Sequence, residues 1–121
     1  MSIKLAVRQV NDVAVLDASG RITLGPDATT LRETVRDLVA KGQKKLLLNL
    51  AEVSYIDSSG IGELVSVFTT VANQGGKVKL LNLTKRVHDL LQITKLYTIF
   101  EVFDNEAAAL ASFSSRTAAA M

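Results

Sequence analysis

The stretch KKLLLNLAEVSYIDSSGIGEL, residues 44–64, joins an apolar run to a helical pattern through a short polar junction. Residues 45–50 form a run that is apolar on both faces, which is typical of a central strand covered on each side. After the junction, apolar side chains recur at helical spacing as far as Gly75-Gly76. The junction itself contains Asp57, Ser58, Ser59, Gly60 and Gly62. The sequence therefore predicts a strand that passes directly into a helix, with the chemically active side chains where the two meet.

A hairpin is predicted at the start of the chain. Ile3, Leu5 and Val7 alternate with polar residues, and a second alternating segment runs from Val13 to Ala18. The dipeptide Asn11-Asp12 lies between the two segments, and both residue types tolerate the positive φ angles of a tight turn. We therefore expect two antiparallel strands.

An amphipathic helix is predicted between the hairpin and the central strand. Pro26 suits the first position of a helix, and Gly42 stands where a glycine commonly ends one. The apolar residues between them fall on one face: Ala28, Leu31, Val35, Leu38 and Val39.

The remainder of the chain continues the alternation of strands and helices. Residues 77–83 read as a buried strand, and Thr84 is a plausible N-cap for a short helix. Residues 98–103 read as a final strand, after which Asp104 is expected to cap a last helix.

This order predicts an α/β protein with a mixed, mostly parallel sheet of about five strands, about four helices and an opening antiparallel hairpin. We expect one domain over residues 1–113. Residues 114–121 have little to bury and are expected to form a frayed tail.

The composition excludes several classes of function. The 121 residues suit one domain, and a net charge of +2 with scattered lysines argues against nucleic-acid binding. The absence of cysteine and the single histidine, His88, leave no metal site of the usual kind. The chain begins without a secretory signal, and no apolar run approaches the ~18 residues of a membrane span. We therefore expect a cytoplasmic protein with no membrane insertion.

The junction suits the binding of a partner or an anion. Ser58 and Ser59 are expected at the carboxyl end of a parallel strand, where open α/β sheets usually meet their ligands. The free N–H groups at the start of a helix favour a negative group. Asp57 is expected to cap this helix, but two serines and two glycines exceed what a cap requires.

Motifs of nucleotide-binding and hydrolytic enzymes do not fit the junction. A serine nucleophile elbow requires a glycine two residues before Ser58, where the chain has Ile56. A dinucleotide fingerprint requires a third glycine at the position of Val65, and NQGGKVKL lacks two elements of a phosphate-binding loop. His88 lies on a predicted helix and is not expected to act as a base.

Residues 46–64, LLLNLAEVSYIDSSGIGEL, closely resemble the signature of STAS domains, specifically the small single-domain anti-sigma factor antagonists of bacteria. Three further stretches resemble other parts of that family: GRITLGPDATTLRETV at residues 20–35, GGKVKLLNLTKRVHDLLQITKL at residues 75–96 and FEVFDNEAAAL at residues 100–110. The resemblance thus covers nearly the whole chain.

The resemblance implies a switch operated by phosphorylation of Ser58. In such antagonists the unphosphorylated domain binds an anti-sigma factor that is also a serine kinase, and a sigma factor is released. Phosphorylation abolishes binding, and a metal-dependent serine phosphatase restores it. ATP and magnesium belong to the kinase, so we expect this chain to be no enzyme and to need no cofactor and no obligatory small-molecule ligand.

A docking surface around Ser58 is also implied. We expect it to include Thr23, Gly25, Asp27, Asp57, Ser58, Ser59, Gly60, Gly62, Glu63 and Ser66, the last two as exposed residues of the second helix. Two interpretations stay open for some of them. Asp57 either only caps the helix or also presents Ser58 to the kinase. Ser59 is either a structural hydroxyl bonded to the helix start or a second phosphate acceptor. Gly60 and Gly62 either let the partner approach or relieve crowding inside the loop.

One departure from the family pattern leaves the kinase unidentified. Many phosphorylated antagonists carry an acidic residue near Arg21 and Thr23, where this chain has none. The alternative is an unphosphorylated STAS scaffold, in a stressosome-like complex or as a regulatory subunit of a lipid-transport ATPase. A nucleotide-binding enzyme is the least favoured hypothesis.

Overall fold

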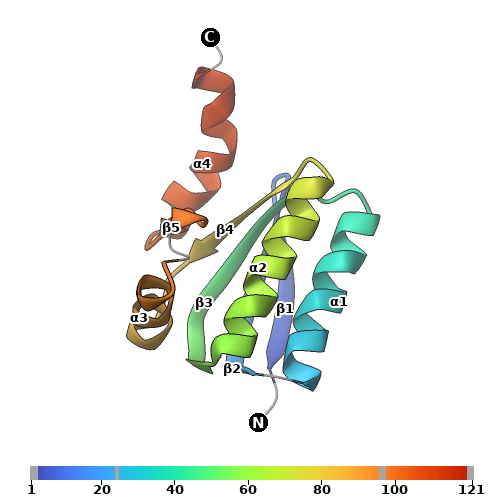
Figure 1. Cartoon of the computed structure of the whole chain (residues 1–121). Helices are drawn as coiled ribbons and strands as arrows, with labels where there is room; N and C mark the ends of the chain where they lie inside the picture. The colour runs from blue at the N-terminus through green and yellow to red at the C-terminus, as the bar shows by residue number, and fades with distance from the viewer. Residues whose placement is uncertain (1–2, 24, 96–97, 120–121) are drawn as a thin grey trace.

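The computed structural model describes residues 3–23, 25–95 and 98–119, and these form five strands and four helices (Figure 1). In chain order they are β1 (Lys4–Val10), β2 (Val13–Ile22), α1 (Pro26–Ala40), β3 (Lys45–Ile56), α2 (Ser58–Asn73), β4 (Lys77–Leu81), α3 (Lys85–Ile93), β5 (Val102–Phe103) and α4 (Glu106–Ala119). Among the helices of this described part, none has the combined length and apolar character needed to cross a membrane.

The strands form one mixed sheet in the order β1-β2-β3-β4-β5. The β1–β2 pair is antiparallel, and the other three pairs are parallel. The predicted fold class is therefore confirmed. Parallel pairing brings the carboxyl ends of β2, β3 and β4 to one edge of the sheet, and α1, α2 and α3 each begin at this edge.

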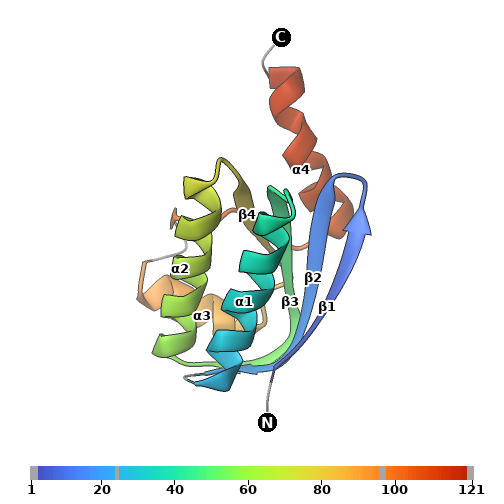
Figure 2. The same ribbon diagram turned by 90° about the vertical axis from the view of Figure 1, so that its right-hand side faces the viewer.

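Helices cover both faces of the sheet. Figure 2 shows α1 and α2 side by side over one face, with α4 on the other side of the sheet. Leu46 and Leu48 of β3 lie in the larger core with residues of α1 and α2. Leu47, which points the other way, lies in a smaller core with Ala109 and Phe113 of α4. Burial on both faces confirms the prediction of a central strand.

The hairpin forms at the predicted turn, where Asn11 has a φ angle of 55° and Val10 pairs with Val13. β2 nevertheless continues to Ile22, four residues beyond the alternating pattern. Its register against β3 shifts between Asp17 and Ser19 and again between Gly20 and Arg21. Such irregularities interrupt the alternation of side chains while the backbone continues to pair, which explains why the sequence pattern ends early.

Local end signals of two helices are confirmed. α1 begins at Pro26, and Gly42 follows its last turn with a φ angle of 92°. The hydroxyl of Thr84 accepts a hydrogen bond from the backbone N–H of Val87 and caps α3.

The C-terminal part differs from the prediction at three points. β5 contains only Val102 and Phe103, which pair with Leu80 and Leu81 of β4, so the predicted strand over residues 98–103 is shorter than expected. The cap of α4 is Asn105, whose Oδ1 accepts a hydrogen bond of 2.9 Å from the N–H of Ala108, so the assignment of this role to Asp104 was wrong by one residue. The backbone of α4 runs to Ala119, beyond the predicted domain end at residue 113. Fraying of residues 114–121 stays a prediction.

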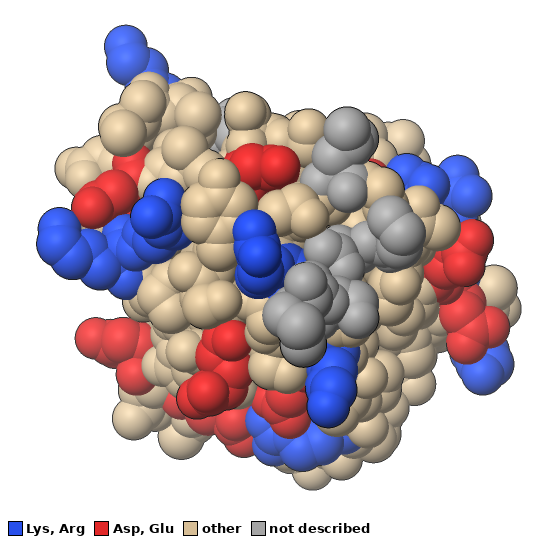
Figure 3. All heavy atoms as spheres, turned by 90° about the horizontal axis from the view of Figure 1, so that it is seen from below, with Lys and Arg blue, Asp and Glu red and all other residues tan. Residues whose placement is uncertain are grey.

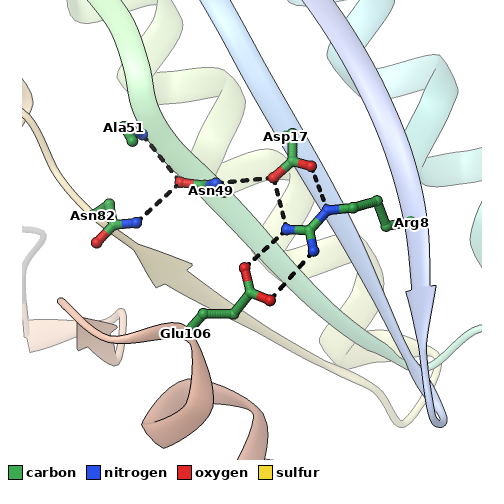
Figure 4. Close-up of polar contacts among 6 residues, drawn as sticks. All are labelled: Arg8, Asp17, Asn49, Ala51, Asn82 and Glu106. Atoms are coloured by element: carbon green, nitrogen blue, oxygen red, sulfur yellow. Dashed lines mark hydrogen bonds and ion pairs between the residues drawn. The ribbon is translucent and has the colours of Figure 1, made fainter.

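A polar network connects α4 to the hairpin (Figure 4). The guanidinium of Arg8 in β1 binds the carboxylates of Asp17 in β2 and Glu106 in α4, with 2.9 Å between Arg8 Nη2 and Glu106 Oε1. Asn49 of β3 donates a hydrogen bond of 2.8 Å to Asp17. The hydrogen bonds to Arg8 hold the pKa of both carboxyl groups below their usual values. The network thus links three strands and one helix.

Candidate functional site

Asp57 controls how β3 passes into α2. Its backbone is extended, and its Oδ1 accepts a hydrogen bond of 2.8 Å from the N–H of Gly60. Its carbonyl oxygen accepts the first helical hydrogen bond, from the N–H of Ile61 at 3.0 Å. The predicted cap is therefore confirmed, and it makes Ser58 the first residue of the helix.

Both junction serines are exposed to solvent. Of the two interpretations of Ser59, the structure does not favour the structural one, because within the described residues the Ser59 hydroxyl makes no hydrogen bond. A role as second phosphate acceptor stays a prediction. Asp57 takes the capping position at the helix start instead, by accepting the hydrogen bond from the N–H of Gly60. The other N–H groups in the first turn of any helix lack intrahelical acceptors, so a phosphate on Ser58 would enter a favourable field.

The end of β2 lies beside this junction. Ile22 pairs with Ile56, and the Ile22 carbonyl accepts a hydrogen bond of 3.4 Å from the N–H of Asp57. The chain after β2, with half-buried Thr23 and Gly25, therefore starts next to the β3–α2 junction. That this segment flanks Ser58 in a docking surface stays a prediction. Gly25 has a φ angle of 99°, a region that favours glycine. The side chain of Asp27 lies outside the described part of the structure.

The two glycines of the motif have different environments. A Cβ added to Gly60 would lie 2.2 Å from the carbonyl oxygen of Ile22 and 2.7 Å from Cγ1 of Ile56. Gly60 is therefore required by crowding inside the fold, which decides between its two interpretations. Gly62 is exposed, and a Cβ there would meet no atom of the described residues within 4 Å. Close approach of a partner stays a prediction for Gly62 alone.

Glu63 does not lie on the exposed face of α2, so that expectation was wrong. The residue is only 8% exposed, and its Oε1 lies 3.0 Å from Nη1 of Arg32 in α1. The two helices pack side by side (Figure 2), and the position of Glu63 on α2 turns it toward α1. Its second oxygen, Oε2, is buried without a hydrogen-bond partner among the described residues. Ser66 is exposed, in agreement with its predicted place on the surface.

The sequence analysis missed a contribution from α3. A hollow next to Ser58 is lined by Asp57 and Tyr55 on one side and by Lys85, Arg86 and Asp89 of α3 on the other. Figure 3 views this end of the molecule from below, and basic side chains lie on the left, where Figure 1 places α3, with acidic ones beside them. The order of elements in the sequence could have predicted this contribution. α3 directly follows β4, which is parallel to β3, so α3 must begin at the same sheet edge as α2.

Two arginines lie over the ring of Tyr55 in this region. The Cζ atom of Arg86 is 4.8 Å from the ring centroid, and that of Arg21 is 5.3 Å from it. Arg21 and Tyr55 are register partners in β2 and β3, whereas Arg86 comes from α3. Three elements thus bring two positive charges to one aromatic ring, and of these residues Tyr55 and Arg86 line the hollow next to Ser58.

The sequence pattern that defines the STAS domain matches residues 4–109 of the chain. The chain belongs to the STAS domain family. This confirms the resemblance inferred from the junction, and the match covers every strand of the sheet.

Relatives of this STAS domain include proteins named as anti-sigma factor antagonists. It is 36% identical to the anti-sigma-B factor antagonist of Bacillus subtilis over 102 residues. This aligned stretch covers 84% of this chain and 92% of the relative. Its fold matches an anti-sigma factor antagonist from Mycobacterium paratuberculosis with a TM-score of 0.81 and 22% identity, over 92% of this chain and 93% of that one. The phosphorylated form of the Bacillus cell fate determinant SpoIIAA matches with a TM-score of 0.72 and 18% identity, over 91% and 99% of the two chains.

Proposed function

We propose that this STAS domain is an anti-sigma factor antagonist whose binding to an anti-sigma factor is controlled by phosphorylation of Ser58. The observation that carries the proposal is the place of Ser58: an exposed hydroxyl on the first residue of α2, directly after the Asp57 cap. The similarity to the B. subtilis antagonist over most of both chains supports the role.

In the proposed cycle, the unphosphorylated domain binds an anti-sigma factor that is also a serine kinase, and the sigma factor is released. The kinase then transfers the γ-phosphoryl group of ATP to Ser58 Oγ, which releases ADP and the hydroxyl proton. A metal-dependent serine phosphatase returns the hydroxyl form. The chain itself catalyses no step, and we place the exchange in the cytoplasm, where the kinase has ATP.

The proposed docking surface surrounds Ser58 at the carboxyl edge of the sheet. It contains Thr23 and Gly25 from the segment after β2, Ser59 and Gly62 from the first turns of α2, and Ser66 one turn further on. Glu63 is excluded because it faces α1. Gly60 is buried beneath this surface and does not take part in docking; its lack of a side chain allows α2 to pack closely against Ile22.

The effect of phosphorylation is expected to be local. A phosphoserine adds about −1.5 to −2 charges at neutral pH, together with bulk. To change a partner from almost fully bound to almost fully free requires a difference of roughly 5.5 kcal/mol in binding free energy. An exposed dianion at the centre of a docking surface can supply such a difference through desolvation and repulsion, without refolding the domain.

The proposal is tested by incubation of the domain with its cognate anti-sigma kinase and ATP, followed by mapping of the modified residue by mass spectrometry. We expect phosphate on Ser58 in the wild type and in Ser59→Ala, and none in Ser58→Ala. Ser54→Ala is the matched control, because Ser54 is an exposed serine of β3 outside the junction. Phosphate on another residue, or on none, would contradict the proposal.

A binding titration tests the switch itself. We expect Ser58→Ala to bind the kinase persistently and Ser58→Glu to bind at least tenfold more weakly, which corresponds to about 1.4 kcal/mol. Equal affinities of these two variants would reject the local electrostatic mechanism.

A further inference from the structure

Arg21 and Arg86 form a positively charged pair without an acidic partner in the described part of the structure. Within the described residues, neither guanidinium makes an ion pair with a carboxylate, whereas Arg8 and Arg32 both do. Both are instead held over the ring of Tyr55, at 5.3 Å and 4.8 Å. A cation–π contact at an exposed site contributes only about 0.5–1 kcal/mol, and two cations on one ring repel each other. The pair would therefore be stabilised by an anion.

The acidic groups nearby are already engaged. Asp57 accepts the hydrogen bond from the N–H of Gly60. Asp89 lies 3.2 Å from Nζ of Lys85 and 3.5 Å from Nδ1 of His88, and these contacts hold the pKa of Asp89 below its usual value. The lining of the hollow carries two positive charges, on Lys85 and Arg86, and two negative charges, on Asp57 and Asp89. Lys85 is paired with Asp89, so within the described residues Arg86 is the cation of the lining that has no ion-pair partner, and Arg21 adds its charge across the Tyr55 ring.

Ser58 lines the same hollow as Arg86 and Tyr55. We propose that a phosphate on Ser58 is bound within the same molecule by the guanidinium of Arg86, which Tyr55 supports and whose charge Arg21 reinforces. This inference rests on the proposed phosphorylation of Ser58. A guanidinium presents two parallel N–H groups to a phosphate, and such charge-assisted pairs are about twice as strong as neutral hydrogen bonds.

The proposal gives the phosphorylated form a defined structure. The bound phosphate occupies part of the hollow beside α3 and neutralises the charge of Arg86, which is open to a partner in the unphosphorylated form. Two features of the docking surface therefore change together, the shape of the hollow and its net charge, which becomes more negative.

The experiment uses the full chain with phosphoserine incorporated genetically at position 58, so that no kinase is needed. The second pKa of the phosphate is measured by a pH titration followed by ³¹P NMR. A free phosphoserine titrates near pH 6, and a bound guanidinium stabilises the dianion and lowers this value. In Arg86→Gln we expect the second pKa of the phosphate to rise by at least about 0.3, which is a twofold change in proton affinity. In Arg21→Gln we expect a smaller rise of this pKa.

Matched variants separate the bond to Arg86 from general charge effects. Arg86→Lys keeps the charge without the paired donors and is expected to give an intermediate value. Arg36→Gln removes an exposed arginine near the other end of α1 and is expected to leave the value unchanged. Arg86 is itself exposed, so its replacement is expected to leave the fold intact, which circular dichroism checks.

A second measurement follows the Arg86 Nε–H resonance in the phosphorylated and unphosphorylated proteins, where a downfield shift on phosphorylation is expected. Identical phosphate titrations in the wild type and Arg86→Gln, with no shift of this resonance, would overturn the inference. Failure of a kinase to modify Ser58 would instead contradict the proposed function, and the two failures are therefore distinguishable.

Discussion

Gly60, in the first turn of α2, lies directly against the backbone of Ile22 at the end of β2, so that a Cβ at position 60 would be 2.2 Å from the Ile22 carbonyl oxygen. Gly60→Ala is expected to destabilise the fold by about 1–3 kcal/mol, because backbone must move to make room. Gly62→Ala is the matched control: it introduces a better helix former into open space and is expected to be neutral or to stabilise by up to ~1 kcal/mol. Urea unfolding of both variants measures the difference, and equal midpoints would contradict the crowding.

Asp57 allows its two interpretations to be separated. Asp57→Ala removes the acceptor of the Gly60 N–H bond and is expected to cost about 0.5–2 kcal/mol of stability. Asp57→Asn keeps an acceptor oxygen but removes the charge, so its stability should remain close to that of the wild type. If Asp57→Asn is stable and is still phosphorylated at the normal rate, the residue acts as a cap only. A stable variant with slow phosphorylation would show that the charge helps to present Ser58.

The ion pair between Arg32 and Glu63 is asymmetric in burial, with side-chain exposures of 39% and 9%. Arg32→Met leaves a buried carboxylate without its cation, and we expect a loss of about 1–3 kcal/mol in unfolding free energy. Glu63→Met leaves a partly exposed arginine and removes the unpartnered Oε2, so it is expected to be nearly neutral or stabilising. Thermal unfolding of the two single variants and the double variant tests this order, and a larger loss for Glu63→Met would refute it.

The network around Arg8 predicts a dependence of stability on acid pH. Hydrogen bonds from Arg8 lower the pKa of Asp17 and Glu106 from their usual values of 3.8 and 4.5. A pKa that is lower in the folded state means that the unfolded chain takes up protons first as the pH falls. The stabilisation is therefore fully present above about pH 4.5 and is lost as the pH falls through the lowered values.

Arg8→Met is expected to flatten this acid dependence. The three side chains are 32–41% exposed, so solvent screening limits the effect to about 0.2–1 kcal/mol. Urea unfolding of the wild type and the variant between about pH 5 and pH 3 measures it, with Arg36→Met as a control for the loss of an exposed arginine. An equally steep decline in Arg8→Met would show that other carboxyl groups cause the acid sensitivity.

The parts of the fold that the sequence predicted depend on short-range signals. Asn11 in the hairpin turn, Pro26 and Gly42 at the ends of α1 and Thr84 at the start of α3 each act within a few residues of themselves. The errors are of two kinds. The cap of α4 was misplaced by one residue although its signal is local, because adjacent Asp104 and Asn105 are both good capping residues. The length of β5 depends instead on pairing with the distant strand β4, which only two of its residues achieve.

The sequence by itself determined that this chain is a STAS domain with a capped, serine-bearing junction after its central strand, because those signals are contiguous. Only the tertiary structure decided which junction residues face outward. Gly60 is enclosed by Ile22, and Glu63 is turned toward Arg32, because β2 and α1 pack against α2. Tyr55 and Arg86, 31 positions apart, meet beside Ser58 because parallel strands end at one edge. Contacts between distant segments depend on register and packing, which no local pattern encodes.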